Sequence, residues 1–144
     1  MKRVQEEFER VIKDLRPEVR FNIISYSKQL DKWRKELVPA SDKNKLAAVK
    51  YAWTLAPATT TSFYDAVDKA LDDASDLELI VVLSDGKPTS GKIVDQSNIL
   101  KVLTKRNKFH QVSITPLGLD LDDQHRQFLK KLSDDNFGEL WEIR

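Results

Sequence analysis

The sequence predicts an α/β fold in which helices cover both faces of a mostly parallel sheet. The strongest indication is the run LIVVL, Leu79 to Leu83, which no polar residue interrupts. Strands that are buried on both faces have such continuous apolar runs, and parallel sheets between helices are their usual setting. Strand-like and helix-like segments also alternate along the chain. This alternation favours right-handed crossovers and a doubly wound, three-layer α/β/α sandwich.

Length and composition exclude several classes of protein. A chain of 144 residues fits a single domain, which we expect to span residues 1–144. The 24 basic and 23 acidic residues form no long block of one sign, so nothing favours a nucleic-acid partner. Without cysteine there is no disulfide or thiolate metal site, and the compartment is left open. The charged start of the sequence does not resemble an apolar signal core, so we expect no signal peptide in the chain as given, and no segment has the ~20 apolar residues that membrane insertion needs.

The first half of the chain predicts helices and short strands in alternation. The expected elements are a helix over about residues 2–16, a strand from Phe21 to Ser27, a short edge strand near Val38, and a helix over about residues 42–55. Pro39 supports the edge position, because proline cannot donate to a central ladder. Ser41 is the expected cap of the second helix, whose apolar face is expected to consist of Leu46, Val49 and Trp53.

The second half predicts a regular alternation of strands and helices. The expected elements are a helix that starts after Ser62, the apolar strand that ends at Leu83, a helix over about residues 95–106, a strand over 111–117, a helix over about 123–133, and a last strand over 139–143. Ser62 with Asp65 three residues later fits a capping box at the start of the first of these helices. In the helix over 123–133, Phe128, Leu129 and Leu132 are expected to face the core.

Two loops carry the candidate site residues. The sequence TTTS ends at Ser62 before a helix, and SDG follows the most buried strand. Both loops fall at the carboxyl edge of the predicted sheet, where open α/β folds bind ligands. The Thr61 hydroxyl and the Asp85 carboxylate could converge there on one magnesium-type ion, although a hard cation needs about six oxygens. Alternatively, Asp85 and Gly86 only form a tight turn.

No motif of a known catalytic type is present. The two histidines, His110 and His125, form no HExxH pair and are expected on the surface, and there is no GxSxG elbow. The four glycines are too scattered for a phosphate-binding loop. A magnesium-dependent hydrolase that uses Asp85 as a ligand or nucleophile remains an alternative.

Several segments together resemble the von Willebrand factor type A domain, in the branch similar to inter-alpha-trypsin inhibitor heavy chains. They are RFNIISYS, LVPAS, TSFYDAVDKAL, LIVVLSDGKPTSG and FLKKLSDDNFGEL. The resemblance covers essentially the whole chain and implies a doubly wound fold that binds protein partners, often through a metal-ion-dependent adhesion site. It assigns Thr61 and Asp85 to that metal site, with Ser62, Ser84 and Gly86 in the supporting loops.

One part of the family pattern is missing. In the family, a DxSxS loop after the first strand supplies most of the metal ligands, and the sequence contains no DxSxS. The resemblance therefore implies an N-terminally incomplete domain with the first strand absent, and an incomplete metal site. We expect no cofactor, or weak binding of magnesium or manganese.

These observations predict a non-catalytic protein-binding domain of the adhesion or scaffold type. A metal-independent interaction domain is the first alternative, and the hydrolase is the second. The resemblance also implies a gap in the sheet between the strand Phe21 to Ser27 and the strand that ends at Leu83. Unpaired strands are costly, so we expect these two strands to pair directly or to accept a strand from another chain. The second case would give a homo-oligomer through exposed sheet edges.

Overall fold

The computed structural model describes residues 2–26, 30–55, 62–84 and 88–143. The chain forms two compact units, Met1–Thr59 and Thr60–Arg144, each of which is described by itself. In the first unit the elements are α1 (Lys2–Lys13), β1 (Arg20–Phe21), β2 (Ile24–Tyr26), β3 (Leu30–Lys32), β4 (Val38–Pro39) and α2 (Asp42–Thr54). Strand β1 pairs with β4 and β2 pairs with β3, both in the antiparallel sense.

The predicted strand from Phe21 to Ser27 is divided into two by Asn22. The side-chain oxygen of Asn22 accepts hydrogen bonds from the backbone N–H groups of Ile23 at 2.8 Å and Arg34 at 3.0 Å, and its amide donates to the Arg34 carbonyl at 2.8 Å. A side chain thus replaces a backbone partner at this point, which interrupts the ladder.

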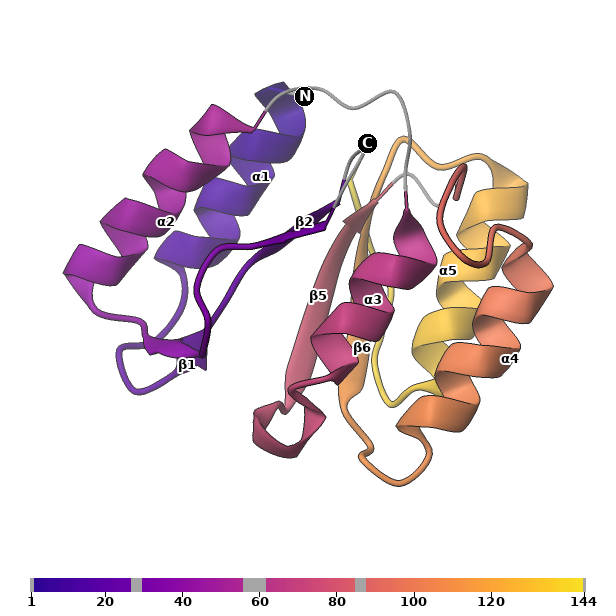
Figure 1. Cartoon of the computed structure of the whole chain (residues 1–144). Helices are drawn as coiled ribbons and strands as arrows, with labels where there is room; N and C mark the ends of the chain where they lie inside the picture. Colours follow the sequence, from indigo (N-terminus) through magenta and orange to yellow (C-terminus); the bar gives the residue numbers. More distant parts are fainter. Residues whose placement is uncertain (1, 27–29, 56–61, 85–87, 144) are drawn as a thin grey trace. The chain divides into compact units, whose positions relative to one another are not determined.

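Helices α1 and α2 pack side by side in the first unit (Figure 1). The cap predicted at Ser41 is confirmed, because its hydroxyl accepts the Asn44 N–H at 3.2 Å. The predicted apolar face of α2 is wrong at two of its three positions: Leu46 is 58% exposed and Trp53 is 41% exposed. The buried side chains are Ala48 and Ala52, which are the small residues.

The second unit contains the predicted parallel sheet. Its elements are α3 (Phe63–Leu71), a 3-10 turn (Ala74–Asp76), β5 (Leu79–Ser84), α4 (Gln96–Asn107), β6 (Ser113–Leu119), α5 (Asp123–Asp135) and β7 (Trp141–Ile143). The strand order is β5-β6-β7, all parallel, with Ser84 in register with Gly118. Helix α4 contacts both α3 and α5, so these three helices form one layer against the sheet (Figure 1).

The core of the second unit lies between this layer and the sheet. Phe63 of α3 and Phe128 of α5 meet edge to face, with ring centroids 5.4 Å apart. The fully buried side chains around them include Ile99, Leu103, Val112, Ile114, Leu129 and Leu132. The inward positions predicted for α5, namely Phe128, Leu129 and Leu132, are therefore confirmed. None of the described helices is both long enough and apolar enough to cross a membrane.

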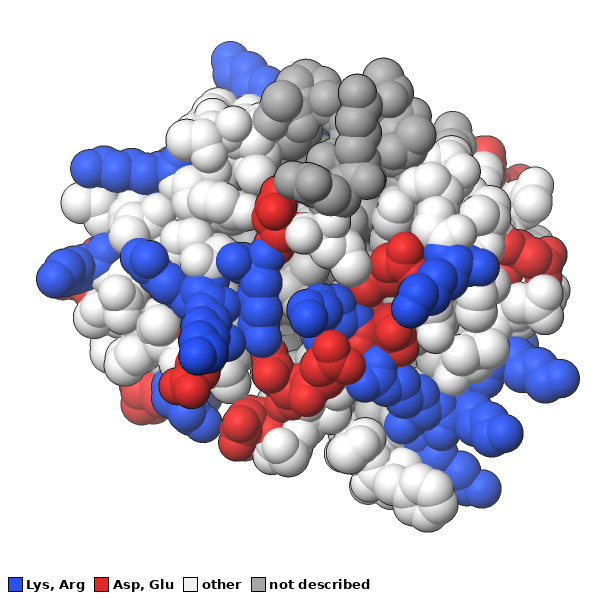
Figure 2. Space-filling model, viewed as in Figure 1, with Lys and Arg blue, Asp and Glu red and all other residues white. Residues whose placement is uncertain are grey.

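Charged side chains of both signs are interspersed over the face in Figure 2, and blue side chains gather over α4 at the lower right. In the described part of the chain, β2 pairs with β3, and β5 pairs with β6. Whether β2 or β5 accepts a further strand from another chain stays a prediction.

The end of α5 contains one left-handed residue and one close backbone approach. Phe137 has a φ of 62°, and the Gly138 N–H donates to the Ser133 carbonyl at 3.0 Å. Glycine commonly occupies the left-handed position that follows a helix. Here glycine is one residue later, because a Cβ at Gly138 would lie 2.0 Å from the Ile114 carbonyl oxygen.

We therefore expect substitutions at Gly138 and Phe137 to have opposite effects on the free energy of unfolding. Gly138→Ala should lower the free energy of unfolding by more than about 2 kcal/mol, because the contact is with backbone and cannot relax easily. Phe137→Gly should raise it by about 0.5 kcal/mol, since the left-handed strain disappears and little burial is lost. Urea unfolding of both variants beside the parent measures this, and equal stability of Gly138→Ala and parent would contradict the close approach.

Helices α3 and α4 are joined by an ion-pair network. The Arg106 guanidinium of α4 bonds the carboxylate and backbone carbonyl of Asp68 and donates to Asp72 at 2.7 Å. The hydroxyl of Tyr64 also bonds the Asp68 carboxylate. Burial, together with the charge of Asp68 and this hydrogen bond, raises the pKa of Tyr64 above its ordinary value.

The raised pKa of Tyr64 predicts a loss of stability at alkaline pH. Above about pH 10 the unfolded chain releases the phenolic proton more readily than the folded chain, so the free energy of unfolding falls as pH rises. Tyr64→Phe removes the titrating group and should reduce this fall. Urea unfolding of parent and variant at pH 8 and pH 11 measures it, and identical falls in the two proteins would contradict the assignment.

Candidate functional site

Two of the predicted site residues, Ser62 and Ser84, lie at the carboxyl edge of the β5-β6-β7 sheet. Ser84 ends β5 and is buried, and Ser62 immediately precedes α3. Three of the predicted residues, Thr61, Asp85 and Gly86, lie outside the described residues. The described structure therefore shows the end of β5 and the first turn of α3, and the site itself stays a prediction.

A loop that follows β5 is fastened to the first turn of α3. The hydroxyls of Ser62 and Ser90 are hydrogen-bonded at 2.8 Å, and the Lys92 N–H donates to the Asp65 carboxylate at 3.3 Å. Gly91 lies between these two bonds with a φ of +102°, and a Cβ there would meet Asp65 Oδ2 at 2.8 Å. The loop therefore depends on glycine at this position.

These bonds correct the predicted capping box. Ser62 is the N-cap of α3, but its side chain makes no capping hydrogen bond. Its hydroxyl bonds Ser90, and the Asp65 carboxylate accepts from Lys92. Both side chains that were expected to cap the helix serve instead to hold the loop.

The described residues alone do not fit a metal site. No group of three or more histidine or acidic side chains is close enough to hold an ion within the described ranges. The hydroxyls of Ser62 and Ser90 are engaged with one another. A hard divalent cation needs several more oxygens than these residues provide.

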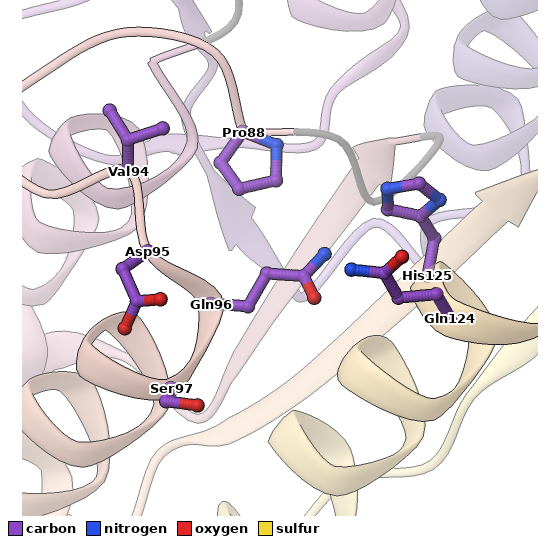
Figure 3. Close-up of a pocket in the computed structure, with 7 residues that line it drawn as sticks. All are labelled: Pro88, Val94, Asp95, Gln96, Ser97, Gln124 and His125. Atoms are coloured by element: carbon purple, nitrogen blue, oxygen red, sulfur yellow. The ribbon is translucent and has the colours of Figure 1, made fainter.

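An open pocket of about 400 Å³ lies where α4 and α5 begin (Figure 3). It is lined by Pro88, Val94, Asp95, Gln96, Ser97, Gln124 and His125. The side-chain amides of Gln96 and Gln124 point toward one another in Figure 3, and the His125 ring lies beside Gln124. Most of the lining is therefore polar, with groups that can both donate and accept hydrogen bonds.

The acidic residues at the helix starts have structural partners. Asp95 accepts the Asn98 N–H at 3.0 Å and caps α4. Asp122 caps α5 through the His125 N–H at 2.9 Å, and the same oxygen lies 2.6 Å from His125 Nδ1. His125 is thus held against its own helix. Among the described residues that line the pocket, no nucleophile is paired with a base.

Sequence analysis missed this pocket. It placed His125 on the surface, whereas the side chain is only 15% exposed. The available signal was the spacing of Asp122 and His125, which is that of an N-cap and its third following residue. Gln96 and Gln124 gave no signal, because they meet only through the packing of α4 on α5.

Comparisons with known proteins agree with this architecture. The von Willebrand factor type A domain matches residues 1–140 of the chain. The chain belongs to this family. Inter-alpha-trypsin inhibitor heavy chain H2 of Sus scrofa is 30% identical over 149 aligned positions, which cover 96% of the chain and 16% of the relative. Heavy chain H4 of Homo sapiens is 32% identical over 143 positions, which cover 90% and 15%.

Solved structures show the same fold. A von Willebrand factor type A protein from Catenulispora acidiphila superposes with a TM-score of 0.78 at 16% identity, covering 97% of this chain and 33% of that one. An aerotolerance-related membrane protein from Bacteroides fragilis gives 0.67 at 12% identity, covering 99% and 80%. The predicted family and the predicted doubly wound α/β fold are thereby confirmed. The von Willebrand factor type A chain spans only about a sixth of the heavy chains that it resembles.

The hydrogen bond between the Lys92 N–H and the Asp65 carboxylate can be tested by substitution. Asp65→Ala removes the acceptor of the Lys92 N–H, so hydrogen exchange at Lys92 should become about tenfold faster. The free energy of unfolding should fall by no more than about 1 kcal/mol, because the bond is exposed. Asp65→Asn is the matched control, since its side-chain oxygen can still accept the bond. Slow exchange at Lys92 in Asp65→Ala would contradict the fastening.

Proposed function

We propose that this von Willebrand factor type A domain is a non-catalytic module of the adhesion or scaffold type, which binds a protein partner at the carboxyl edge of its sheet. The observation that carries the proposal is family membership over residues 1–140, which supports a protein-interaction domain. The carboxyl edge is the expected surface, because open α/β sheets bind ligands there. The similarity to inter-alpha-trypsin inhibitor heavy chains, at 30% identity, gives more distant support for the same conclusion.

The chemistry of the carboxyl edge supports binding rather than catalysis. Gln96, Gln124 and His125 present hydrogen-bonding groups in an open pocket, which suits the surface of a partner better than a small substrate. The loop at Ser90 is held to α3, so this part of the edge is already ordered before a partner binds. Preorganisation of this kind lowers the entropy cost of association.

We further propose that the metal site of the family is incomplete in this chain. The described residues offer too few oxygens, and Thr61 with Asp85 would add only one hydroxyl and one carboxylate. Partner binding would then rely mainly on the protein groups at the edge. A metal-independent interaction domain is the limiting case, in which Thr61 and Asp85 bind no ion.

Affinity capture with the purified chain, in magnesium and separately in EDTA, tests the proposal. We expect the double variant Gln96→Ala, Gln124→Ala to lose a captured partner at least about tenfold, because both amides face the pocket. Gln127→Ala is the matched control, since Gln127 is exposed on the same helix as Gln124. If the pocket variant and the control capture the partner equally well, the pocket is not the binding surface and the assignment is contradicted.

Calorimetry with magnesium and manganese on the same samples tests the metal site separately. We expect a dissociation constant above about 0.1 mM, and no shift of the melting temperature. Tighter binding that Asp85→Ala abolishes would show that the site is complete. Equal capture in magnesium and EDTA would favour the metal-independent form of the proposal.

A further inference from the structure

Helix α4 differs in charge from the other helices of its unit. Its sequence, QSNILKVLTKRN, contains no acidic residue. Each lysine of α3 and α5, by contrast, pairs with an aspartate three or four positions away on its own helix or at its end, as in Lys69–Asp72, Lys130–Asp134 and Lys131–Asp135. The positive charge of α4 is therefore not balanced within the helix.

Three lysines form a line on the exposed side of α4. Lys101, Lys105 and the C-cap residue Lys108 follow the spacing i, i+4, i+7, which places their side chains one above the other on a helix. All three are exposed. No ion pair joins any of them to an acidic side chain in the part of the chain that the structure describes. Figure 2 shows basic side chains gathered over this part of α4.

The remaining basic residue of the helix fixes which way this line faces. Arg106 turns toward α3, where it binds Asp68 and Asp72. Asp68 and Asp72 are thus bound to Arg106 on the side of α4 that faces α3. The lysines lie on a different side, and their positive charge remains open to solvent.

An exposed aromatic residue ends the line. Phe109 is 88% exposed, more than any other large apolar side chain of the described residues. The loop that carries it is closed by the fully buried Asn107, whose side chain bonds both the N–H of Val112 at 3.0 Å and its carbonyl at 2.8 Å. The Gln111 N–H also donates to the Asn107 carbonyl at 2.9 Å. A rigid loop therefore presents Phe109 to solvent.

We propose that Lys101, Lys105, Lys108 and Phe109, here called the lysine stripe, dock an acidic protein segment that carries an apolar side chain. Charge complementarity identifies the partner: three unpaired ammonium groups in a line fit carboxylates spaced along a peptide, and Phe109 offers an apolar contact at one end. A preordered aromatic anchor beside charges is typical of an energetically important contact.

A membrane surface fits less well than an acidic peptide. Interfacial helices insert a wide apolar face, but the apolar residues Ile99 and Leu103 of α4 are fully buried in the core. Among the described residues of α4 and the loop after it, Phe109 is the one large apolar side chain that is strongly exposed. Along the helix axis, at 1.5 Å per residue, the lysine stripe begins about 7.5 Å from Gln96 at Lys101 and ends about 18 Å from it at Lys108, so most of the stripe lies away from the carboxyl-edge pocket.

An array of random 12-residue peptides, probed with the purified chain in EDTA, tests the proposal. We expect the bound peptides to be enriched in aspartate and glutamate together with at least one large apolar residue. The dissociation constant of the best peptide should rise at least about tenfold in the triple variant Lys101→Gln, Lys105→Gln, Lys108→Gln, and about fivefold in Phe109→Ser. These substitutions are exposed and leave the core unchanged.

A matched control separates the effect of the lysine stripe from the effect of net charge. Lys2→Gln, Lys130→Gln, Lys131→Gln removes the same charge from lysines that are paired, and should change binding less than twofold. No acidic enrichment on the array, or equal losses in the two triple variants, would overturn the proposal. So would binding to phosphatidylserine vesicles through the stripe without binding to the peptides. The pocket variant Gln96→Ala, Gln124→Ala should bind the peptides normally, so a failure here is distinguishable from a failure at the carboxyl edge.

Discussion

A pair of buried amides determines much of the second unit. Asn107 at the end of α4 and Asn136 after α5 are both fully buried, and their side chains bond one another at 3.1 Å. Asn107 also binds both backbone groups of Val112, while Asn136 donates to Thr104 at 3.1 Å and to the Leu132 carbonyl at 2.8 Å. Every polar atom of the two amides thus has a partner, as buried polar groups require. The ends of two helices and the start of a strand are fixed to one another through this pair.

The close packing beside the amide pair follows from it. The Asn136 carbonyl accepts the Ile114 N–H at 3.0 Å, which draws the end of α5 against β6. The next turn of chain must then pass over the Ile114 carbonyl, where only Gly138 leaves enough space. Glycine is required there, and the residue before it, Phe137, has a left-handed backbone. A close backbone approach and a strained residue therefore lie next to one another.

The sequence predicts those features that depend on burial of a continuous apolar pattern. The strand that ends at Leu83 and the inward face of α5 are predicted correctly from their apolar residues. The expected burial of the whole run from Leu79 to Leu83 is wrong, because only Ile80 and Val82 are buried and Leu79 is 47% exposed. The predicted face of α2 is also wrong: Ala48 and Ala52 lie against its neighbour while Leu46 is exposed, and this choice depends on how closely two helices approach. At the carboxyl edge, a local rule assigned Ser62 to a cap, but a partner 28 residues away in sequence competes for its hydroxyl.

The fixed position of α4 bears on how its two surfaces can act. Asp95 caps its first turn, Arg106 ties its last turn to α3, and Asn107 anchors its end to β6 and α5. The Asp95 cap is internal to the helix, whereas Arg106 and Asn107 hold its C-terminal end to other elements. The helix therefore cannot turn or slide without breaking the buried hydrogen bonds of Asn107, which are costly to leave unmade. Partners at the carboxyl-edge pocket and at the lysine stripe can therefore bind independently unless the Arg106 and Asn107 contacts are broken. Coupling between the two surfaces would need a second arrangement of α4 in which both sets of bonds are replaced.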